Sequence, residues 1–168
     1  VTKYPNDSKN LSDWYSGKYQ GEIWGYETEG IAKTQAEMDE WLKTHDQSAL
    51  PKGSNWGAGD IMYRDLNGDG KINTGKNTVD DPGDRRIIGN STPRYNYGVT
   101  IDLKYRNVDF SAFLQGTAKR DLDVRGVYFN GANTGVWQST GFTEHLDYFR
   151  AADTQSPLGP NVDSYYPR

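Results

Sequence analysis

Three oxygen-bearing side chains at alternate positions, followed by a glycine, make one acidic loop the part of this sequence best suited to bind a metal ion. They are Asp65, Asn67 and Asp69, and the glycine is Gly70. Calcium takes six to eight oxygen ligands, and loops of this kind supply three of them from positions one, three and five, with Gly at position six allowing a sharp turn. The main-chain carbonyl at position seven, here Lys71, is a further ligand. The spacing predicts a Ca²⁺ site.

The ligand that would complete this site is harder to place. Position twelve, where such loops carry a bidentate Glu, is Lys76. Carboxylates follow later, at Asp80, Asp81 and Asp84, and Asp84 can complete the site if the residues between are an insertion. The alternative is a run of tight turns without metal, because Asn, Asp and Gly favour such turns by themselves. The flanking segments are poor helices, which favours a structural role over a calcium switch.

The region before the acidic loop contains one expected helix, over about residues 35 to 45. Thr34 can cap it, and Glu37, three residues later, can complete a capping box. One face carries residues at helical spacing: Met38, Trp41, Leu42 and His45. We expect this face to pack in a core, and residues 1 to 33 to form short extended pieces between turns.

Alternating apolar and polar residues predict two long strands after the acidic loop. In "YNYGVTIDLKY", residues 95 to 105, the odd positions are apolar or aromatic and the even positions are polar or Gly. This is the period of a strand with one apolar face. A second alternation starts at Val108, with Phe113 as its exception. Since only Arg106 and Asn107 separate the two, they are expected to form an antiparallel hairpin over residues 95 to 116.

Two kinds of sheet fit this hairpin. Periodicity alone favours a half-buried sheet of a soluble domain, because alternation is weak evidence in any single segment. The other reading is a transmembrane barrel, whose strands have about 9 to 11 residues, an apolar face toward lipid and aromatic residues near the membrane surfaces. Tyr95, Tyr97 and Tyr105 lie near the two ends of the apolar face.

The composition excludes several classes of protein. The chain has 168 residues, of which 34% are hydrophobic, with 19 Gly and 12 Tyr, a balance that favours short strands and long polar loops. The net charge of −4 without a basic stripe makes nucleic acid an unexpected partner. The lack of cysteine excludes a disulfide scaffold and a Cys nucleophile. No carboxylate pair is convincingly spaced for glycoside hydrolysis, and neither His45 nor His145 lies beside a nucleophile motif, so we expect no enzyme.

A long segment, residues 59 to 116, carries a specific resemblance. Its string "GDIMYRDLNGDGKIN…DRRIIGNSTPRYNYGVTIDLKYRNVDFSAFLQG" resembles the SusC/RagA group of TonB-dependent outer-membrane transporters, near their C-terminal third. Residues 21 to 41 and 145 to 168 resemble the flanking family segments. Two features depart from the family pattern. The Asp of its Asp-Arg pair, Asp84, stands eight residues later than usual, and Asn73 stands where the family usually has Asp.

The resemblance implies a mainly β fold, in which an antiparallel hairpin belongs to a transmembrane β-barrel. Residues 1 to 94 would form a long extracellular loop region with the short helix near 35–45 and the acidic loop 65–84. Residues 95 to 116 would be the barrel hairpin, and residues 117 to 168 the following extracellular loop. The turn between the strands would be periplasmic, because periplasmic turns are short. We expect the chain to be a fragment of a larger barrel protein.

The resemblance also implies a function, the import of a bulky nutrient, glycan or peptide, across the outer membrane. A SusD-like surface lipoprotein would cover the barrel, outer-membrane lipid would surround it, and the TonB complex would supply energy through parts outside this chain. Calcium would pin the loop through Asp65, Asn67, Asp69, the Lys71 carbonyl and Asp84. The alternative is a secreted, calcium-braced carbohydrate-binding module. Its aromatic residues for sugar stacking would be Trp14, Tyr15, Trp24, Tyr26, Trp56 and Trp137.

Overall fold

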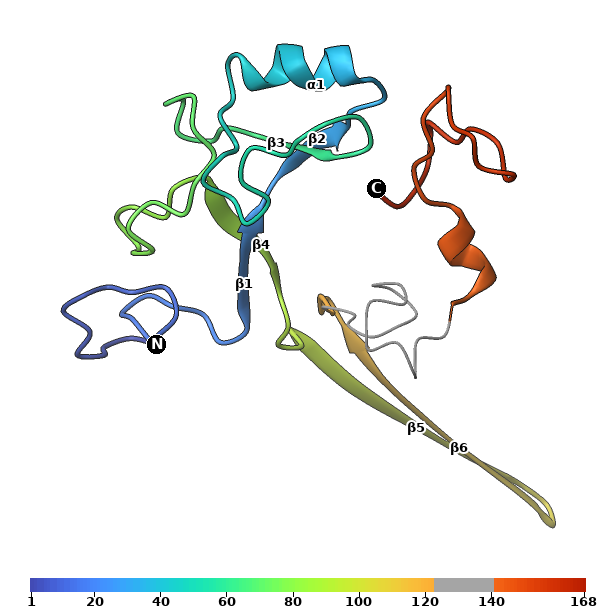
Figure 1. The fold of residues 1–168 in the computed structure, drawn as a ribbon. Coiled ribbons are helices and arrows are strands. Elements are labelled where there is room, and N and C mark those ends of the chain that lie inside the picture. The colour runs from blue at the N-terminus through green and yellow to red at the C-terminus, as the bar shows by residue number, and fades with distance from the viewer. Residues whose placement is uncertain (123–140) are drawn as a thin grey trace.

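One long hairpin projects from a loop-rich body in the computed structural model, which describes residues 1–122 and 141–168 (Figure 1). The body contains β1 (Glu22–Tyr26), β2 (Thr28–Ile31), α1 (Gln35–Leu42), β3 (Ile61–Tyr63) and β4 (Arg85–Asn90). The hairpin is β5 (Tyr95–Tyr105) and β6 (Val108–Ala118), and a 3₁₀ helix η1 (Thr143–Leu146) lies near the C-terminus. The described strands form three antiparallel pairs, β1–β4, β2–β3 and β5–β6.

The register of β5 and β6 places most apolar residues on one face of the hairpin and most polar residues on the other. Four cross-strand pairs form the centre of the apolar face: Tyr97↔Gly116, Val99↔Leu114, Ile101↔Ala112 and Leu103↔Phe110. The opposite face carries Asp102↔Ser111 and Lys104↔Asp109. The predicted hairpin is confirmed, and β6 runs two residues beyond its predicted end at 116.

Both faces of the hairpin are open over most of its length. Every residue of β5 is exposed, including Ile101 at 41% and Leu103 at 61%. Arg106 adopts a left-handed conformation (φ 51°), which lets two residues reverse the chain. The apolar face thus remains uncovered by the rest of the described chain.

Helix α1 covers the small hydrophobic core of the body. The Thr34 Oγ1 accepts a hydrogen bond from the Glu37 N–H at 3.1 Å, as predicted for the cap, whereas the Glu37 carboxylate accepts from the Lys33 N–H at 2.7 Å. Met38 is fully buried against Ala32 and Met62. The helix ends at Leu42, earlier than the predicted residue 45. His45 instead stacks on Trp41, with ring centroids 3.8 Å apart.

The C-terminal segment docks on the body through one buried carboxylate. Asp60 is 2% exposed and accepts two hydrogen bonds from the Arg168 guanidinium, at 3.0 and 2.9 Å, and one from Lys52. We call these three residues the Asp60 clasp. The Phe149 ring lies against Gly59, where a side chain would collide with it at 2.2 Å. Residues far apart in sequence thus close the body into one unit.

No described helix is both long and apolar enough to cross a membrane.

Candidate functional site

The acidic loop is a tight turn in which side-chain oxygens accept hydrogen bonds from the loop's own backbone. The Asp65 carboxylate accepts from the N–H groups of Asn67 (3.1 Å), Gly68 (2.6 Å) and Gly70 (2.7 Å). Gly68 and Gly70 have φ values of 78° and 76°, the left-handed region that glycine adopts without strain. The Asp69 carboxylate accepts from the Lys71 N–H at 2.7 Å. A turn of this shape is expected both for the calcium loop and for the metal-free run of tight turns.

Asp84 lies beneath this turn and is fully buried. Its two carboxylate oxygens accept hydrogen bonds from the N–H groups of Leu66 (3.0 Å) and Asn73 (2.8 Å), near the beginning and the end of the turn. Burial raises the pKa of Asp65, but hydrogen bonds from the backbone N–H groups of Gly70, Gly68 and Asn67, with a contribution from the Asp84 side chain, outweigh it, so that pKa lies below its ordinary value. The two carboxyl groups are therefore close neighbours.

The other two candidate carboxylates lie elsewhere. Asp80 is exposed and pairs with Lys9 at 2.6 Å. Asp81 lies against Gly75, within the turns that precede Asp84. Of the three, only Asp84 has a carboxylate hydrogen-bonded to the acidic turn.

The residues between Asn73 and Asp84 form an ordered excursion. The Arg85 guanidinium holds it by donating to the carbonyl oxygens of Pro82 and Thr74 and to the Asn77 side chain. Asn77 in turn donates to Asn10 of the N-terminal segment. This packing explains how the chain returns to the acidic turn despite eight extra residues.

The donor set fits calcium in part. Among residues 1–122 and 141–168, no three acidic or histidine side chains are grouped closely enough to hold an ion by themselves. A site here would need the Asn67 amide oxygen and the Lys71 carbonyl as well. The Lys71 carbonyl accepts from the Asn73 amide at 3.2 Å, and the Asn67 amide donates to Asp69 at 3.2 Å. A bound ion would replace these two hydrogen bonds, which is compatible with oxygen donors at positions one, three, five and seven.

The aromatic residues expected for a sugar-binding surface do not form one open row. Tyr15 is buried, and its hydroxyl donates to Glu22 at 2.6 Å. Tyr26 and Trp56 both pack edge-on against Tyr63. Trp24 is half-buried, the exposed Trp14 lies under the Lys18 ammonium at 5.8 Å, and Trp137 falls outside the described residues.

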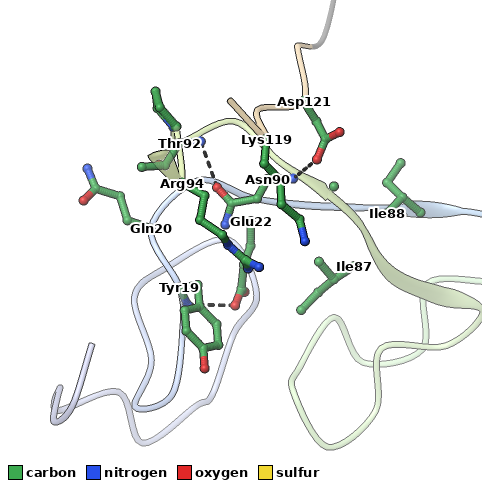
Figure 2. A pocket seen from close by; sticks show the side chains of 12 residues that line it. Tyr19, Gln20, Glu22, Ile87, Ile88, Asn90, Thr92, Arg94, Lys119 and Asp121 are labelled. Carbon is green, nitrogen blue, oxygen red and sulfur yellow. Dashed lines mark hydrogen bonds between the residues drawn. The ribbon is translucent and has the colours of Figure 1, made fainter. Parts of the chain in front are cut away.

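A second candidate site is an open cleft at the point where β4 meets the hairpin (Figure 2). Its volume is about 480 Å³. It is lined by Tyr19, Gln20, Glu22, Ile87, Ile88, Gly89, Asn90, Thr92, Pro93, Arg94, Lys119 and Asp121. Burial and the hydrogen bond to Glu22 raise the pKa of Tyr15, behind this wall, to about 12. Sequence reasoning missed the cleft because three separate segments build it and none carries a motif.

Comparisons with known proteins found curated relatives of this chain. No family model matches the sequence, and no solved structure matches it. Two curated proteins of Formosa agariphila are similar to it. TonB-dependent receptor P3 is 29% identical over 106 residues, which cover 63% of this chain and 9% of that protein. TonB-dependent receptor P26 is 32% identical over 108 residues, 62% of this chain and 9% of that protein. The chain thus spans about 9% of the length of these relatives.

A mainly β chain with a two-faced antiparallel hairpin, exposed on its apolar side, is compatible with a piece of an outer-membrane barrel. The two matches are to TonB-dependent receptors, so the chain is similar to a part of such a receptor, and the predicted resemblance is confirmed at this level. Receptors of this kind lie in the outer membrane, which agrees with the predicted location. The narrower SusC/RagA assignment stays a prediction.

Proposed function

We propose that this chain is part of a TonB-dependent transporter that imports a bulky nutrient, a glycan or a peptide, with a SusD-like lipoprotein at the cell surface. The observation that carries the proposal is the exposed apolar face of β5 and β6. In water this face would favour association. In a barrel it would contact lipid, while the face with Asp102 and Lys104 would line the lumen.

The dimensions of the hairpin support this placement. Each strand has 11 residues. At about 3.3 Å per residue and a tilt of about 40°, such a strand covers roughly 25 Å, the height of the apolar band of outer-membrane barrels. The tight turn at Arg106 and Asn107 would be periplasmic, and the body at the other end extracellular. A secreted carbohydrate-binding module would have to bury the same face in a second sheet.

The placement can be tested in the bacterium that makes the full-length receptor. These 168 residues contain no cysteine, so a cysteine introduced into them reports its own position once the labelling of the unchanged receptor has been subtracted. We expect Ser8→Cys to react with a membrane-impermeant maleimide on intact cells, and Asn107→Cys to react only after the outer membrane is opened. Background labelling is measured on the receptor without either change. Reaction of Asn107→Cys on intact cells, or recovery of the receptor in the culture medium, would contradict the placement.

The transport role has its own test. Deleting the receptor gene should abolish growth on the nutrient that induces it, and restoring the gene should restore growth only in cells with a functional TonB complex. Affinity purification of the receptor from detergent-solubilised membranes should recover the SusD-like lipoprotein. Growth that persists without TonB would exclude energised import, and purification without the lipoprotein would exclude that partner.

We infer that the acidic turn binds one structural Ca²⁺, through Asp65, Asn67, Asp69, the Lys71 carbonyl and Asp84. The buried Asp84 carboxylate beside Asp65 supports this choice of fifth ligand. When bound, the ion would join oxygen atoms from both sides of the excursion. Its effect would be to hold a long polar loop in one shape, since binding to the folded form alone stabilises that form.

Limited proteolysis of the purified receptor tests the calcium proposal. Millimolar Ca²⁺ should slow cleavage within residues 65–84 relative to chelator, and Asp69→Asn should weaken this protection. Asp80→Asn is the matched control, because it removes the same charge from an exposed residue outside the turn. If the parent is cleaved equally with calcium and chelator, the turn is held by hydrogen bonds alone. If Asp80→Asn loses protection and Asp69→Asn does not, the ligands have been assigned wrongly.

A further inference from the structure

We propose that the cleft between β4 and the hairpin, here named the rim cleft, binds a carboxylate or sulfate group carried by a sugar. The residues that matter are Tyr19, Glu22, Ile87, Arg94, Lys119 and Asp121. The proposal that the cleft binds an anionic sugar group depends on the cleft alone. The interpretation of that group as part of an imported nutrient rests on the proposed transport function.

The acidic side chains that line the rim cleft have hydrogen-bond partners within the described chain, whereas the basic ones do not. The two Glu22 oxygens accept hydrogen bonds from the Tyr19 N–H at 2.7 Å and the Tyr15 hydroxyl at 2.6 Å. Asp121 accepts from the Asn90 N–H at 2.8 Å (Figure 2). Arg94 and Lys119, in contrast, form no ion pair or side-chain hydrogen bond with any described residue. An anion that pairs with these two cations must therefore come from outside this part of the chain.

The backbone holds the two cations at the ends of the hairpin. Arg94 immediately precedes β5, Lys119 immediately follows β6, and the Arg94 N–H donates to the Lys119 carbonyl at 3.2 Å. Lys119 has a left-handed φ of 55°, which few residues other than glycine adopt. Such a conformation is kept where the surrounding structure enforces it. Two residues after Lys119, the Asp121 N–H donates a hydrogen bond to the Asn90 carbonyl at 2.9 Å and so holds this part of the backbone against the end of β4.

The remaining walls indicate a sugar as the carrier of the anionic group. Tyr19 is 72% exposed, so its ring and hydroxyl are free to contact a ligand. Ile87 and Ile88, about half exposed, form an apolar side, and the Gln20 amide adds a hydrogen-bonding group. A flat aromatic ring, an apolar side and a few convergent polar groups suit a ring that has both C–H surfaces and hydroxyls. A carboxylate or sulfate on that ring would meet the guanidinium of Arg94 with matched geometry.

The position of the rim cleft fits early contact with a ligand from outside the cell. If the hairpin turn is periplasmic, the Arg94 and Lys119 end of the strands is the extracellular end of the barrel wall. Since Glu22 and Asp121 line the same cleft, an anionic ligand would be held there by direct contact with Arg94 and Lys119, a charge interaction that salt weakens.

A cysteine reporter in the full-length receptor tests the cleft without requiring uptake. Ile87→Cys places a thiol in the cleft, and its reaction rate is measured on intact cells with an anionic and a cationic methanethiosulfonate reagent. Replacing both cations, Arg94→Gln with Lys119→Gln, should lower the anionic-to-cationic rate ratio by roughly threefold to tenfold, the size expected for two charges about 6 to 8 Å from the thiol in water at physiological salt. The control, Lys43→Gln with Lys76→Gln, removes the same charge outside the cleft and should leave the ratio unchanged.

Protection of the thiol then identifies the ligand class. Millimolar oligogalacturonate or a sulfated galactan oligosaccharide should slow labelling, and a neutral galactan oligosaccharide of equal length should not. The double variant should lose this protection and the control should keep it. Protection by the neutral sugar, protection that survives in the double variant, or no protection by either anionic sugar would each overturn the proposal. Protection by an oligoglutamate peptide alone would overturn the sugar assignment. Import that proceeds without protection would refute the cleft and leave the transport role intact.

Discussion

Replacing Ile101 with lysine is expected to disrupt the assembled barrel far more than the same replacement of Thr100. The two residues are neighbours at the middle of β5 but project to opposite faces. Ile101 lies one residue from the strand midpoint, which is about 2.5 Å along the membrane normal at the usual rise and tilt. A lysine there would sit near the centre of the bilayer, opposite Ala112, which is too small to shield it.

The cost follows from that depth. A lysine on the lipid face near the midplane costs about 2 to 4 kcal/mol, whereas lumen-facing substitutions affect stability little. We expect Ile101→Lys to shift the urea midpoint of the refolded receptor in lipid vesicles accordingly, and Thr100→Lys to leave it nearly unchanged. Ala112→Lys, on the same face of β6, should behave like Ile101→Lys. Equal losses for Ile101→Lys and Thr100→Lys would refute the assignment of the two faces.

Three further outcomes are expected for the full-length receptor. Gly116→Ala should cost about 1 to 3 kcal/mol in urea unfolding, because its methyl group would meet the Tyr97 ring at 2.3 Å; in a Tyr97→Ala background that cost should vanish. Asp60→Asn should increase hydrogen exchange in residues 147–168. Burial raises the Asp60 pKa, but hydrogen bonds from Arg168 and Lys52 outweigh it and hold this pKa below its ordinary 3.8. Acidification of the unchanged receptor through the folded-state pKa of Asp60 should therefore also increase exchange in residues 147–168, whereas exchange at neutral pH should stay low. Met38→Ala should cost about 2 to 4 kcal/mol in the same unfolding measurement, since this side chain is fully buried; a loss below 1 kcal/mol would contradict its role in the core.

The hairpin could be predicted because everything that specifies it is local. Alternation over residues 95 to 105, a second alternation from Val108 and a two-residue connection leave one antiparallel pairing. The start of α1 was predictable for the same reason, since Thr34 and Glu37 lie within one turn. The end of the helix was not, because the apolar spacing runs on to His45 and no local residue marks the end at Leu42.

Contacts between distant segments could not be read from the sequence. Strand β4 carries no alternation, and it forms only because β1 pairs with it, bringing Trp24 opposite Ile87 with an irregular register beside it. The rim cleft depends on this same pairing. The position of Asp84 was predictable only through the Asp-Arg pair of the family pattern, because spacing alone placed Lys76 at position twelve. Burial then distinguishes Asp84 from Asp80 in the structure.

The Asp60 clasp bears on the order in which the parts of this chain fold. It joins residues 108 positions apart. Loop-closure entropy grows so slowly with length that doubling such a separation adds only about 0.6 kcal/mol, so the distance hardly weakens the final contact. Folding rate, however, falls as contacts become less local. The hairpin, with its two-residue turn, should therefore form early, and the segment carrying Phe149 and Arg168 should dock late. Between these steps the apolar strands are already formed while the surface that closes the body is still open, so this is the interval in which the chain is most vulnerable to aggregation.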